Sequence, residues 1–469
     1  MGAWGIEGYS VANQSPRSGT EARAQSAAER SSIPPADMIP VSIGFGSYAR
    51  LLRTNRNFRL LWSAQIVSEL GDWFYTLVIY SLLLDLTGKA GSVALALVLQ
   101  LIPSTLMTAT AGVVNDHMRR KVVMIISDLF RLVIVLAMLA ASASRMVWFI
   151  YTLLFLEAMM VTFFEPARTA IVPNICAEED ILIANTLSST TWSLILAVGS
   201  ALGGLVAVLF GNNAVFLINA ASFALSAAFI SRMRFEEPHA EDRPPMRLRD
   251  LVDFSAVRDG LQYVRSDARR VAMLLVKSGL GVIGPGWVLF TVMGKRYFPV
   301  HLHGLSVERS AILGMSVMLA ARGVGALLGP LVSATWAGRS QKRLRFGIFY
   351  GFVAAAIGYT LLGYAKTLLL ACAFTILAHM GGAVAWVFST TLLQLNTEDR
   401  FRGRVFAAEL GLAMVTLAAG AYLAGYFLDA GVPPPSVATD AGLLMFIPAA
   451  VWMWAQRLWK NQPEPAVQD

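Results

Sequence analysis

The chain has 469 residues, of which 56% are hydrophobic and only 14% are charged, and its formal net charge is +8. Soluble domains carry about a quarter of charged residues, so this composition excludes an ordinary soluble fold. We attribute the positive charge to loops at a membrane surface, not to nucleic-acid binding. The two cysteines, Cys176 and Cys372, are too few for a disulfide framework or a metal site, and no cofactor is expected.

Residues 1–57 are rich in Ser, Ala, Gly, Pro and Arg and contain no apolar run. We expect a disordered cytoplasmic segment without a cleavable signal peptide, in which Met38 is an alternative start to Met1. Six apolar runs follow, each long enough to cross a bilayer as a helix of about 20 residues. They lie at residues 58–86, 92–114, 121–142, 146–165, 184–209 and 213–231.

A polar, basic stretch at residues 232–270 separates these runs from six more. Apolar residues recur at helical spacing from Leu248 to Arg270, which predicts an amphipathic helix along the inner membrane surface. A helix that binds a soluble partner is the alternative. The second set of spans lies at 271–296, 308–335, 344–363, 367–393, 405–429 and 439–457, with a cytoplasmic tail at 458–469. The prediction is an all-α membrane protein of twelve helices in two halves, 58–231 and 271–457.

The short link Gly112–Lys121, with the sequence GVVNDHMRRK, lies between the second and third spans. Short cytoplasmic loops collect Lys and Arg, and most cations of this chain fall on the same side as this link. We therefore expect a multi-pass plasma-membrane protein with both termini in the cytoplasm. The links on the other side are short, so no external domain is expected to bind a macromolecule.

Two six-span halves joined by a cytoplasmic loop resemble the major facilitator superfamily. The family's signature between its second and third helices is matched by Gly112, Asp116, Arg120 and Lys121, while His117 and Arg119 depart from it. Other segments resemble the branch of macrolide-efflux proteins and the enterobactin exporter: Asn55–Trp62, Ser127–Arg131, Glu165–Pro173, Trp192–Gly204 and Thr397–Ala407. The resemblance implies a transporter that alternates access around a central cavity and works as a monomer.

The fifth span contains part of a Gly-rich motif that exporters of this superfamily commonly carry. The matching residues are Gly199, Gly203 and Gly204, whereas Ser200 stands where the family has Pro, and the earlier glycines are absent. Small residues four apart let two helices pack backbone to backbone. The motif therefore supports export only in part, and an ordinary helix contact is the alternative.

Two carboxylates, Glu69 and Asp72, lie near the middle of the first span and share a helix face. Charges at mid-bilayer are costly, and neighbouring carboxylates repel each other, so the pair suits a site that takes up and releases protons. The pair would also attract a cationic substrate. A carboxylate that is paired with a buried cation and has a purely structural role is the alternative.

Other polar residues lie within later spans. Because the first, fourth, seventh and tenth helices line the central cavity of major facilitators, the resemblance implies that Glu157 can share this cavity with Glu69 and Asp72. His379 in the tenth span is a candidate proton relay, with a hydrogen-bonded structural role as the alternative. We expect Lys277 and Arg322 to provide counter-charges in the second half.

A second set of charges is predicted at the cytoplasmic edge. By resemblance, these residues latch helices of the first half and break contact when the protein changes state; membrane orientation alone is the alternative. They are Asp116, Arg120, Lys121, Asp128, Arg131, Glu165 and Arg168.

The sequence thus favours a secondary active, proton-coupled exporter of amphipathic small molecules, such as a drug, a macrolide-like compound or a siderophore. We find no nucleotide-binding motif and no motif of a membrane enzyme. A lysophospholipid flippase or nutrient importer of the same fold is one alternative. A membrane sensor or scaffold that does not transport is another.

Overall fold

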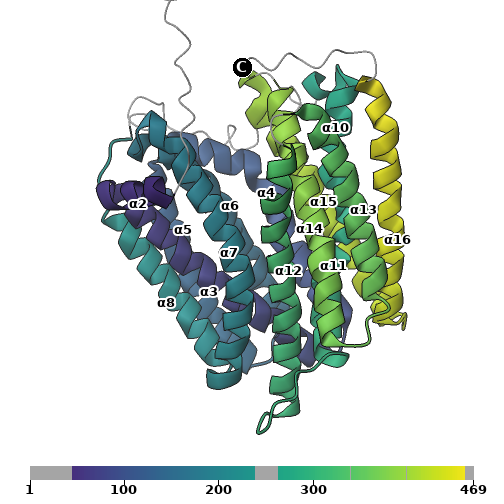
Figure 1. Ribbon diagram of the computed structural model, residues 1–469. Helices are drawn as coiled ribbons and strands as arrows, with labels where there is room; N and C mark the ends of the chain where they lie inside the picture. The colour runs from purple at the N-terminus through teal and green to yellow at the C-terminus, as the bar shows by residue number, and fades with distance from the viewer. Residues whose placement is uncertain (1–44, 238–261, 338–339, 398, 460–469) are drawn as a thin grey trace, which may run out of the picture. The chain divides into compact units, whose positions relative to one another are not determined.

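In the computed structural model, the described residues are 45–237, 262–337, 340–397 and 399–459. The chain divides into two compact units, Met1–Ser47 and Tyr48–Asp469. Of the first unit only residues 45–47 are described, as the start of helix α2 (Phe45–Thr54). The second unit contains twelve helical segments long and apolar enough to cross a membrane (Figure 1). The prediction of an all-α protein with twelve spans is confirmed.

The first half consists of six long helices. They are α3 (Arg56–Thr87), α4 (Ala90–His117), α5 (Arg120–Ala143), α6 (Val147–Ile175), α7 (Glu178–Phe210) and α8 (Asn212–Ser231). The links between them are very short, and two contain a glycine in the left-handed region, Gly88 with φ 69° and Gly211 with φ 82°. A residue without Cβ ends a helix there at little cost, so the chain can reverse within a few residues.

The second half has the same number of spans, but its first span is interrupted. It is built from α10 (Ala268–Gly279), the 3-10 turn η3 (Leu280–Ile283), α11 (Pro285–Arg296), α12 (Val307–Ala337), α13 (Gln341–Leu362), α14 (Leu368–Leu395), α15 (Asp399–Asp429), α16 (Pro434–Ala455) and η4 (Gln456–Trp459). The predicted seventh span does cross, but not as one helix. Pro285 has no N–H to continue the helix, and a side chain at Gly284 would meet the backbone of Leu417 in α15.

Two polar segments were predicted outside the spans, a disordered start at residues 1–57 and an amphipathic helix at 248–270. Residues 45–54 form α2, although they fall in the segment predicted to be disordered. Leu51 of α2 is fully buried, and the Arg50 guanidinium lies 2.6 Å from the Asp180 carboxylate, which explains why this stretch is ordered. The amphipathic helix predicted for 248–270 falls largely outside the described residues.

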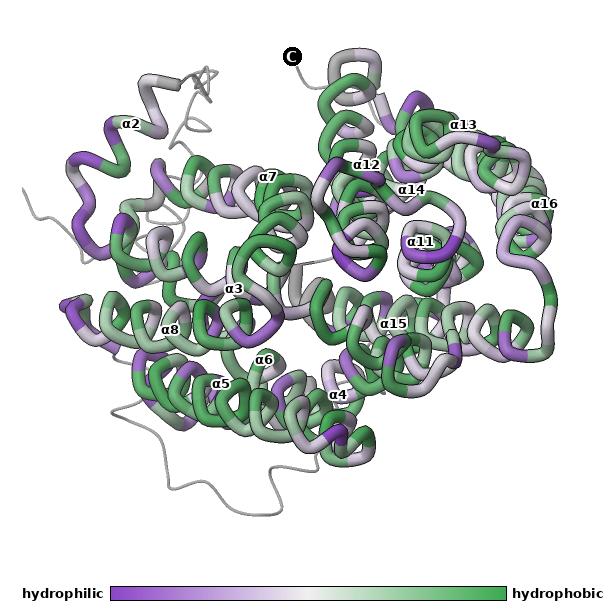
Figure 2. The backbone as a smooth tube through the Cα atoms, turned by 90° about the horizontal axis from the view of Figure 1, so that it is seen from below, coloured by the Kyte–Doolittle hydropathy of each residue, from purple (hydrophilic) through white to green (hydrophobic). Residues whose placement is uncertain are grey.

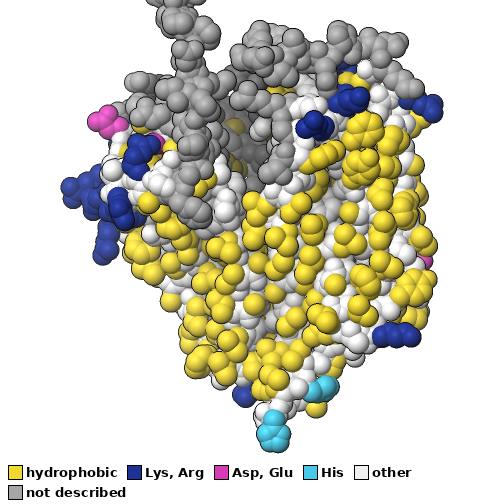
Figure 3. Space-filling view, in the orientation of Figure 1, with side chains coloured by type: hydrophobic (Ala, Val, Ile, Leu, Met, Phe, Trp, Pro, Cys, Tyr) yellow, Lys and Arg dark blue, Asp and Glu magenta, His cyan; other side chains and the backbone are white. Residues whose placement is uncertain are grey.

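The two halves meet along two helix pairs that are distant in sequence. Helix α12 packs against α7, and α15 packs against α4, as Figure 2 shows in the view along the bundle. Hydrophobic side chains cover the middle of the face in Figure 3, whereas most Lys and Arg side chains lie toward one end. We call this end, with the α4–α5, α6–α7 and α8–α10 links, the basic end. The opposite end, with the α3–α4 and α11–α12 links, is called the sealed end for the contacts described next.

Candidate functional site

Contacts between the two halves close the sealed end. The Lys295 ammonium at the end of α11 lies 2.6 and 2.7 Å from the two carboxylate oxygens of Asp85 in α3. Asp429, the last residue of α15, accepts hydrogen bonds from the backbone N–H groups of Ala90 at 2.7 Å and Gly91 at 2.9 Å. A carboxylate at a helix N-terminus is favoured by the helix dipole and satisfies free N–H groups. Two charged contacts therefore tie α3 to α11 and α4 to α15.

Close packing continues this seam toward the middle of the bundle. The rings of Trp73 in α3 and Trp287 in α11 stack with centroids 5.8 Å apart and planes 3° from parallel. A side chain at Gly323 of α12 would meet the backbone of Ala197 in α7. The absence of a side chain thus lets α12 approach α7 at backbone distance.

The glycines of the fifth span make two kinds of contact. A Cβ at Gly199 would lie 3.0 Å from the Trp73 Cβ, and one at Gly203 would lie 2.8 Å from the Phe74 Cα, so both pack α7 against α3. A Cβ at Gly204 would instead collide with Ser316 of α12, in the other half. The same motif therefore packs helices within one half and across the seam.

Beyond the seam lies a cavity of about 400 Å³ between the halves, which we call the central cavity. Its lining is mainly apolar and includes three indole rings. The lining residues are Leu101, Trp192 and Leu196 from the first half, and Leu280, Ile283, Trp287, Arg322, Ala326, Pro330, His379, Gly382, Ala383, Trp386, Val387, Met414 and Leu417 from the second. Arg322 is the one charged residue among these, and none of these lining residues of the described chain is a carboxylate.

Arg322 is partly buried and differs from the buried cations of the described chain. Its guanidinium lies 3.7 Å from the centroid of the Trp287 ring, and its Nη1 atom is buried without a hydrogen-bond partner. The prediction that Arg322 balances a carboxylate is not met among the described residues. Lys277, predicted for the same role, lies 2.8 Å from Glu409, a carboxylate of α15 that sequence reasoning overlooked.

His379 lines the central cavity and is also held in place. Its Nε2 atom lies 3.1 Å from the Tyr359 hydroxyl, and its ring packs edge-on against Phe290, with centroids 5.4 Å apart. The hydrogen bond matches the structural alternative for this residue. The relay role stays a prediction.

Four ionisable residues of the first half form what we call the charge cluster: Asp72 of α3, Asp128 and Arg131 of α5, and Glu157 of α6. The Arg131 guanidinium lies 2.6 Å from Asp72, 3.4 Å from Glu157 and 3.6 Å from Asp128. It also lies 4.0 Å from the centroid of the Phe223 ring. One guanidinium faces three carboxylates, so the cluster has more acids than cations and can accept protons.

The cluster differs from the two groupings predicted from the sequence. Asp72 and Glu157 do come together, but through Arg131, which had been assigned to the cytoplasmic edge. Asp128, assigned to the same edge, is fully buried and accepts a hydrogen bond from Ser226 of α8 at 2.6 Å. None of the four lines the central cavity. Sequence spacing showed the separate pairs but not the packing of α3, α5, α6 and α8 that joins them.

Glu69 lies apart from Arg131, although it shares a helix with Asp72. One of its carboxylate oxygens accepts a hydrogen bond from Gln65 at 2.9 Å, and the other is buried without a partner. The nearest ion pair toward the basic end is Glu165 with Arg168, at 2.7 Å within α6.

The remaining residues of the predicted latch lie at the basic end. Arg120 donates to the carbonyl of Ala170 at 2.8 Å, and Lys121 donates to the carbonyl of Met233 at 2.7 Å. The first bond joins α5 to α6, and the second joins α5 to the segment that follows α8. Asp116 belongs to α4, but its side chain is outside the described part of the chain, and nothing lies within 4 Å of a Cβ at Gly112.

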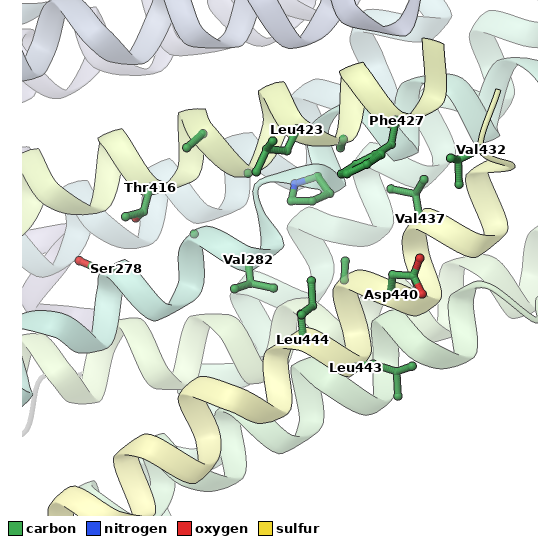
Figure 4. Close-up of a pocket in the computed structure, with 16 residues that line it drawn as sticks. Ser278, Val282, Thr416, Leu423, Phe427, Val432, Val437, Asp440, Leu443 and Leu444 are labelled. Atoms are coloured by element: carbon green, nitrogen blue, oxygen red, sulfur yellow. The ribbon is translucent and has the colours of Figure 1, made fainter. Parts of the chain in front are cut away.

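A second hollow of about 820 Å³ lies between α10–η3–α11, α15 and α16, and we call it the outer groove. Figure 4 shows apolar side chains along it, with Asp440 at one end and Ser278 and Thr416 at the other. Leu423 and Leu443 are each more than half exposed, so the groove opens to the bilayer side of the bundle. The contact of η3 with α15 separates the groove from the central cavity.

The cysteines offer no reactive centre that we can identify. Burial and the negative charge of Asp180 raise the pKa of the Cys176 thiol to about 11, so the thiol stays protonated at neutral pH. Cys372 is a partly buried residue of α14. Within the described ranges, no group of three His, Cys, Asp or Glu residues is placed to hold a metal ion.

The chain is similar to known proteins in family profile, sequence and fold. The profile of a family described as transmembrane secretion effector matches residues 46–463. The uncharacterized MFS-type transporter YfiS of Bacillus subtilis is 26% identical over 370 residues, which cover 76% of this chain and 83% of YfiS. Macrolide efflux protein A of Streptococcus pyogenes is 24% identical over 383 residues, covering 79% and 89%. The crystal structure of the nucleoside transporter NupG shares the fold, with a TM-score of 0.63 at 13% identity over 86% of this chain and 100% of NupG.

Proposed function

We propose that this chain, which belongs to the transmembrane secretion effector family, is a secondary active exporter of amphipathic small molecules. It is a multi-pass membrane transporter of the major facilitator fold. Direction, driving ion and substrate class are the parts that we propose. The observation that carries the proposal is the central cavity, which lies between the halves and is closed toward the sealed end by Asp85–Lys295, Asp429 and the Trp73–Trp287 stack.

Charge distribution supports an orientation in which the sealed end faces outward, a state that an exporter requires for loading. The basic end carries Arg119, Arg120 and Lys121 on one link and Arg232 and Arg234 on another, and such clusters face the cytoplasm. The sealed end is then external. A cavity closed from outside is the state in which an exporter takes its substrate from the cytoplasm or the inner leaflet.

The charge cluster supports proton coupling. Proton uptake by Asp72 or Glu157 removes one of the attractions that hold α3 and α6 to Arg131. Asp72 is followed by Trp73, whose ring stacks on Trp287 of the other half. A proton on the cluster can therefore change the contact between the halves, as alternating access requires.

The experiment is substrate-dependent proton movement in inverted membrane vesicles, followed with a pH-gradient dye and a panel that includes a macrolide. Wild type is compared with Asp72→Asn, Glu157→Gln and the double variant, and with Glu308→Gln, an exposed carboxylate at the start of α12, as the matched control. We expect substrate to dissipate the gradient in wild type and in the control only. If the double variant still transports substrate and still moves protons, the charge cluster has no part in the mechanism. Uptake opposite in direction would replace the exporter with an importer.

A lysophospholipid flippase is a second candidate, favoured by the outer groove. The apolar side chains along the groove are open to the bilayer and fit an acyl chain. Asp440, at the sealed end, can attract a cationic headgroup (Figure 4). The test is leaflet exchange of a fluorescent lysophosphatidylcholine in proteoliposomes. Exchange that is lost in Leu423→Trp, which fills the groove, but kept in Leu369→Trp, at an exposed site on α14, would favour this function.

A further inference from the structure

We infer that the central cavity binds an amphiphile whose oxyanion, such as a carboxylate or sulfonate, sits on a flat apolar body, and that Arg322 receives the anion. This inference rests on the proposed role of the cavity as the substrate site and names the class of substrate. It also departs from the cationic substrate that the carboxylates of the first span suggest. Those carboxylates do not line the cavity.

Arg322 carries a charge that no carboxylate of the described chain balances. Across the described chain, the buried cations Arg131, Lys277 and Lys295 lie within 4.0 Å of carboxylates, whereas the partly buried Arg322 does not. Its Nη1 atom is buried and has no hydrogen-bond partner. Burying a charge without a partner is costly, so proteins keep such groups where a ligand or another charge balances them. A guanidinium presents paired N–H groups that match the two oxygens of a carboxylate.

A further argument is the chemistry around Arg322. The cavity is lined by the indole rings of Trp192, Trp287 and Trp386, and the described residues that line it include no acidic side chain. The neighbouring polar groups already have partners within the protein. The Tyr80 hydroxyl donates to Gln100 at 2.6 Å, and the Tyr359 hydroxyl is engaged by His379. Arg322 is thus the group that is left for the polar part of a ligand.

The cavity and the groups directly behind its aromatic wall carry one net positive charge, that of Arg322. The Lys277 ammonium lies 4.6 Å from the centroid of the Trp386 ring, on the cavity lining. Glu409 neutralises Lys277, so this pair adds no net charge. The cavity therefore presents one net cation among aromatic surfaces, which matches an anion on a flat apolar body and disfavours a cation.

The test uses two probes that share one fluorophore and differ in charge: dansylglycine, an anion, and dansylcadaverine, a cation. Full-length protein in a neutral detergent is titrated with each, and energy transfer from tryptophan to the dansyl group reports binding close to the cavity. Wild type is expected to bind the anion at least about tenfold more tightly than the cation. Arg322→Gln is expected to lose this preference, and Arg322→Lys to keep part of it. Arg309→Gln, an exposed arginine near the start of the same helix, is the matched control.

The thermal midpoint without ligand separates an effect of Arg322→Gln on folding from an effect on binding. Arg322→Gln removes a partly buried charge that has no carboxylate partner among the described residues, so its thermal midpoint without ligand is expected to equal or exceed that of wild type. Tighter binding of the cation by wild type, or an unchanged anion preference in a folded Arg322→Gln, would overturn the inference. Efflux of dansylcadaverine alone would leave the exporter standing and remove the inference. Binding of dansylglycine through Arg322 together with inward transport would leave the inference standing and remove the exporter.

Discussion

The two halves bury ionisable groups in opposite balance. In the first half, three carboxylates surround the single guanidinium of Arg131. In the second half, Lys277 and Glu409 match one to one, and Arg322 has no carboxylate among the described residues. Because each buried charge must be balanced, an excess of acids indicates protons, whereas an excess cation indicates an anionic ligand. The cost of burying an unbalanced charge thus suggests proton binding by the first half and binding of an anionic ligand by the second.

The largest expected effect tests the acidic side of this comparison. Arg131→Met leaves three buried carboxylates without a cation, and we expect a loss of about 3–5 kcal/mol in stability together with loss of transport. Intrinsic-fluorescence unfolding in detergent measures the first, and vesicle transport the second. Arg309→Met is the control on an exposed site. An unchanged unfolding midpoint would mean that Arg131 does not balance the cluster.

The matched pair of the second half should respond differently. Lys277→Met alone leaves Glu409 buried and is expected to cost about 3 kcal/mol, whereas Lys277→Met combined with Glu409→Leu should recover most of that stability. Stability lost in Arg131→Met cannot be recovered in this way, because Arg131 faces three carboxylates and changing one of them leaves the other two unbalanced. Equal unfolding midpoints of the single and double variants would contradict the one-to-one pairing.

The seam between the halves is tested by its glycines. Gly204→Ala places a methyl group against Ser316 of the other half, and we expect a cost of about 1–3 kcal/mol and slower transport. Gly112→Ala is the matched control, since nothing lies within 4 Å of its Cβ. Ser316→Gly should relieve the collision. Equal transport rates for Gly204→Ala and Gly112→Ala would show that this contact does not hold the halves together.

The smallest effect is expected at the sealed end. The Asp85 side chain is 46% exposed, so Asp85→Asn should weaken closure by about 0.2–1 kcal/mol, at most about a fivefold change in the population of open molecules. A cysteine introduced as Ala326→Cys in a Cys176→Ser, Cys372→Ser background reports access to the cavity. Labelling by an impermeant maleimide from outside the cell should rise in Asp85→Asn. Labelling that falls or stays equal would exclude a closing role for the Asp85–Lys295 pair.

Much of the architecture could be read from the sequence. Long apolar runs separated by short links predicted twelve spans, because a helix that crosses a bilayer needs about 20 apolar residues wherever it packs. The ordered motifs from Asn55 to Ala407 indicated the family, and the family profile over residues 46–463 confirms it. These properties depend on local composition and order along the chain, which the sequence contains in full.

The pairing of charges was decided by the tertiary structure alone. Helical spacing placed Glu69 with Asp72 and Asp128 with Arg131, since neighbours one turn apart share a face. Arg131 does lie near Asp128, but packing of the helices also brought it to Asp72 and Glu157, and packing of α10 against α15 brought Lys277 to Glu409. The isolation of Arg322 is of the same kind. A charge is paired or left alone by what other helices bring within a few ångströms of it, and no pattern along a single helix contains that information.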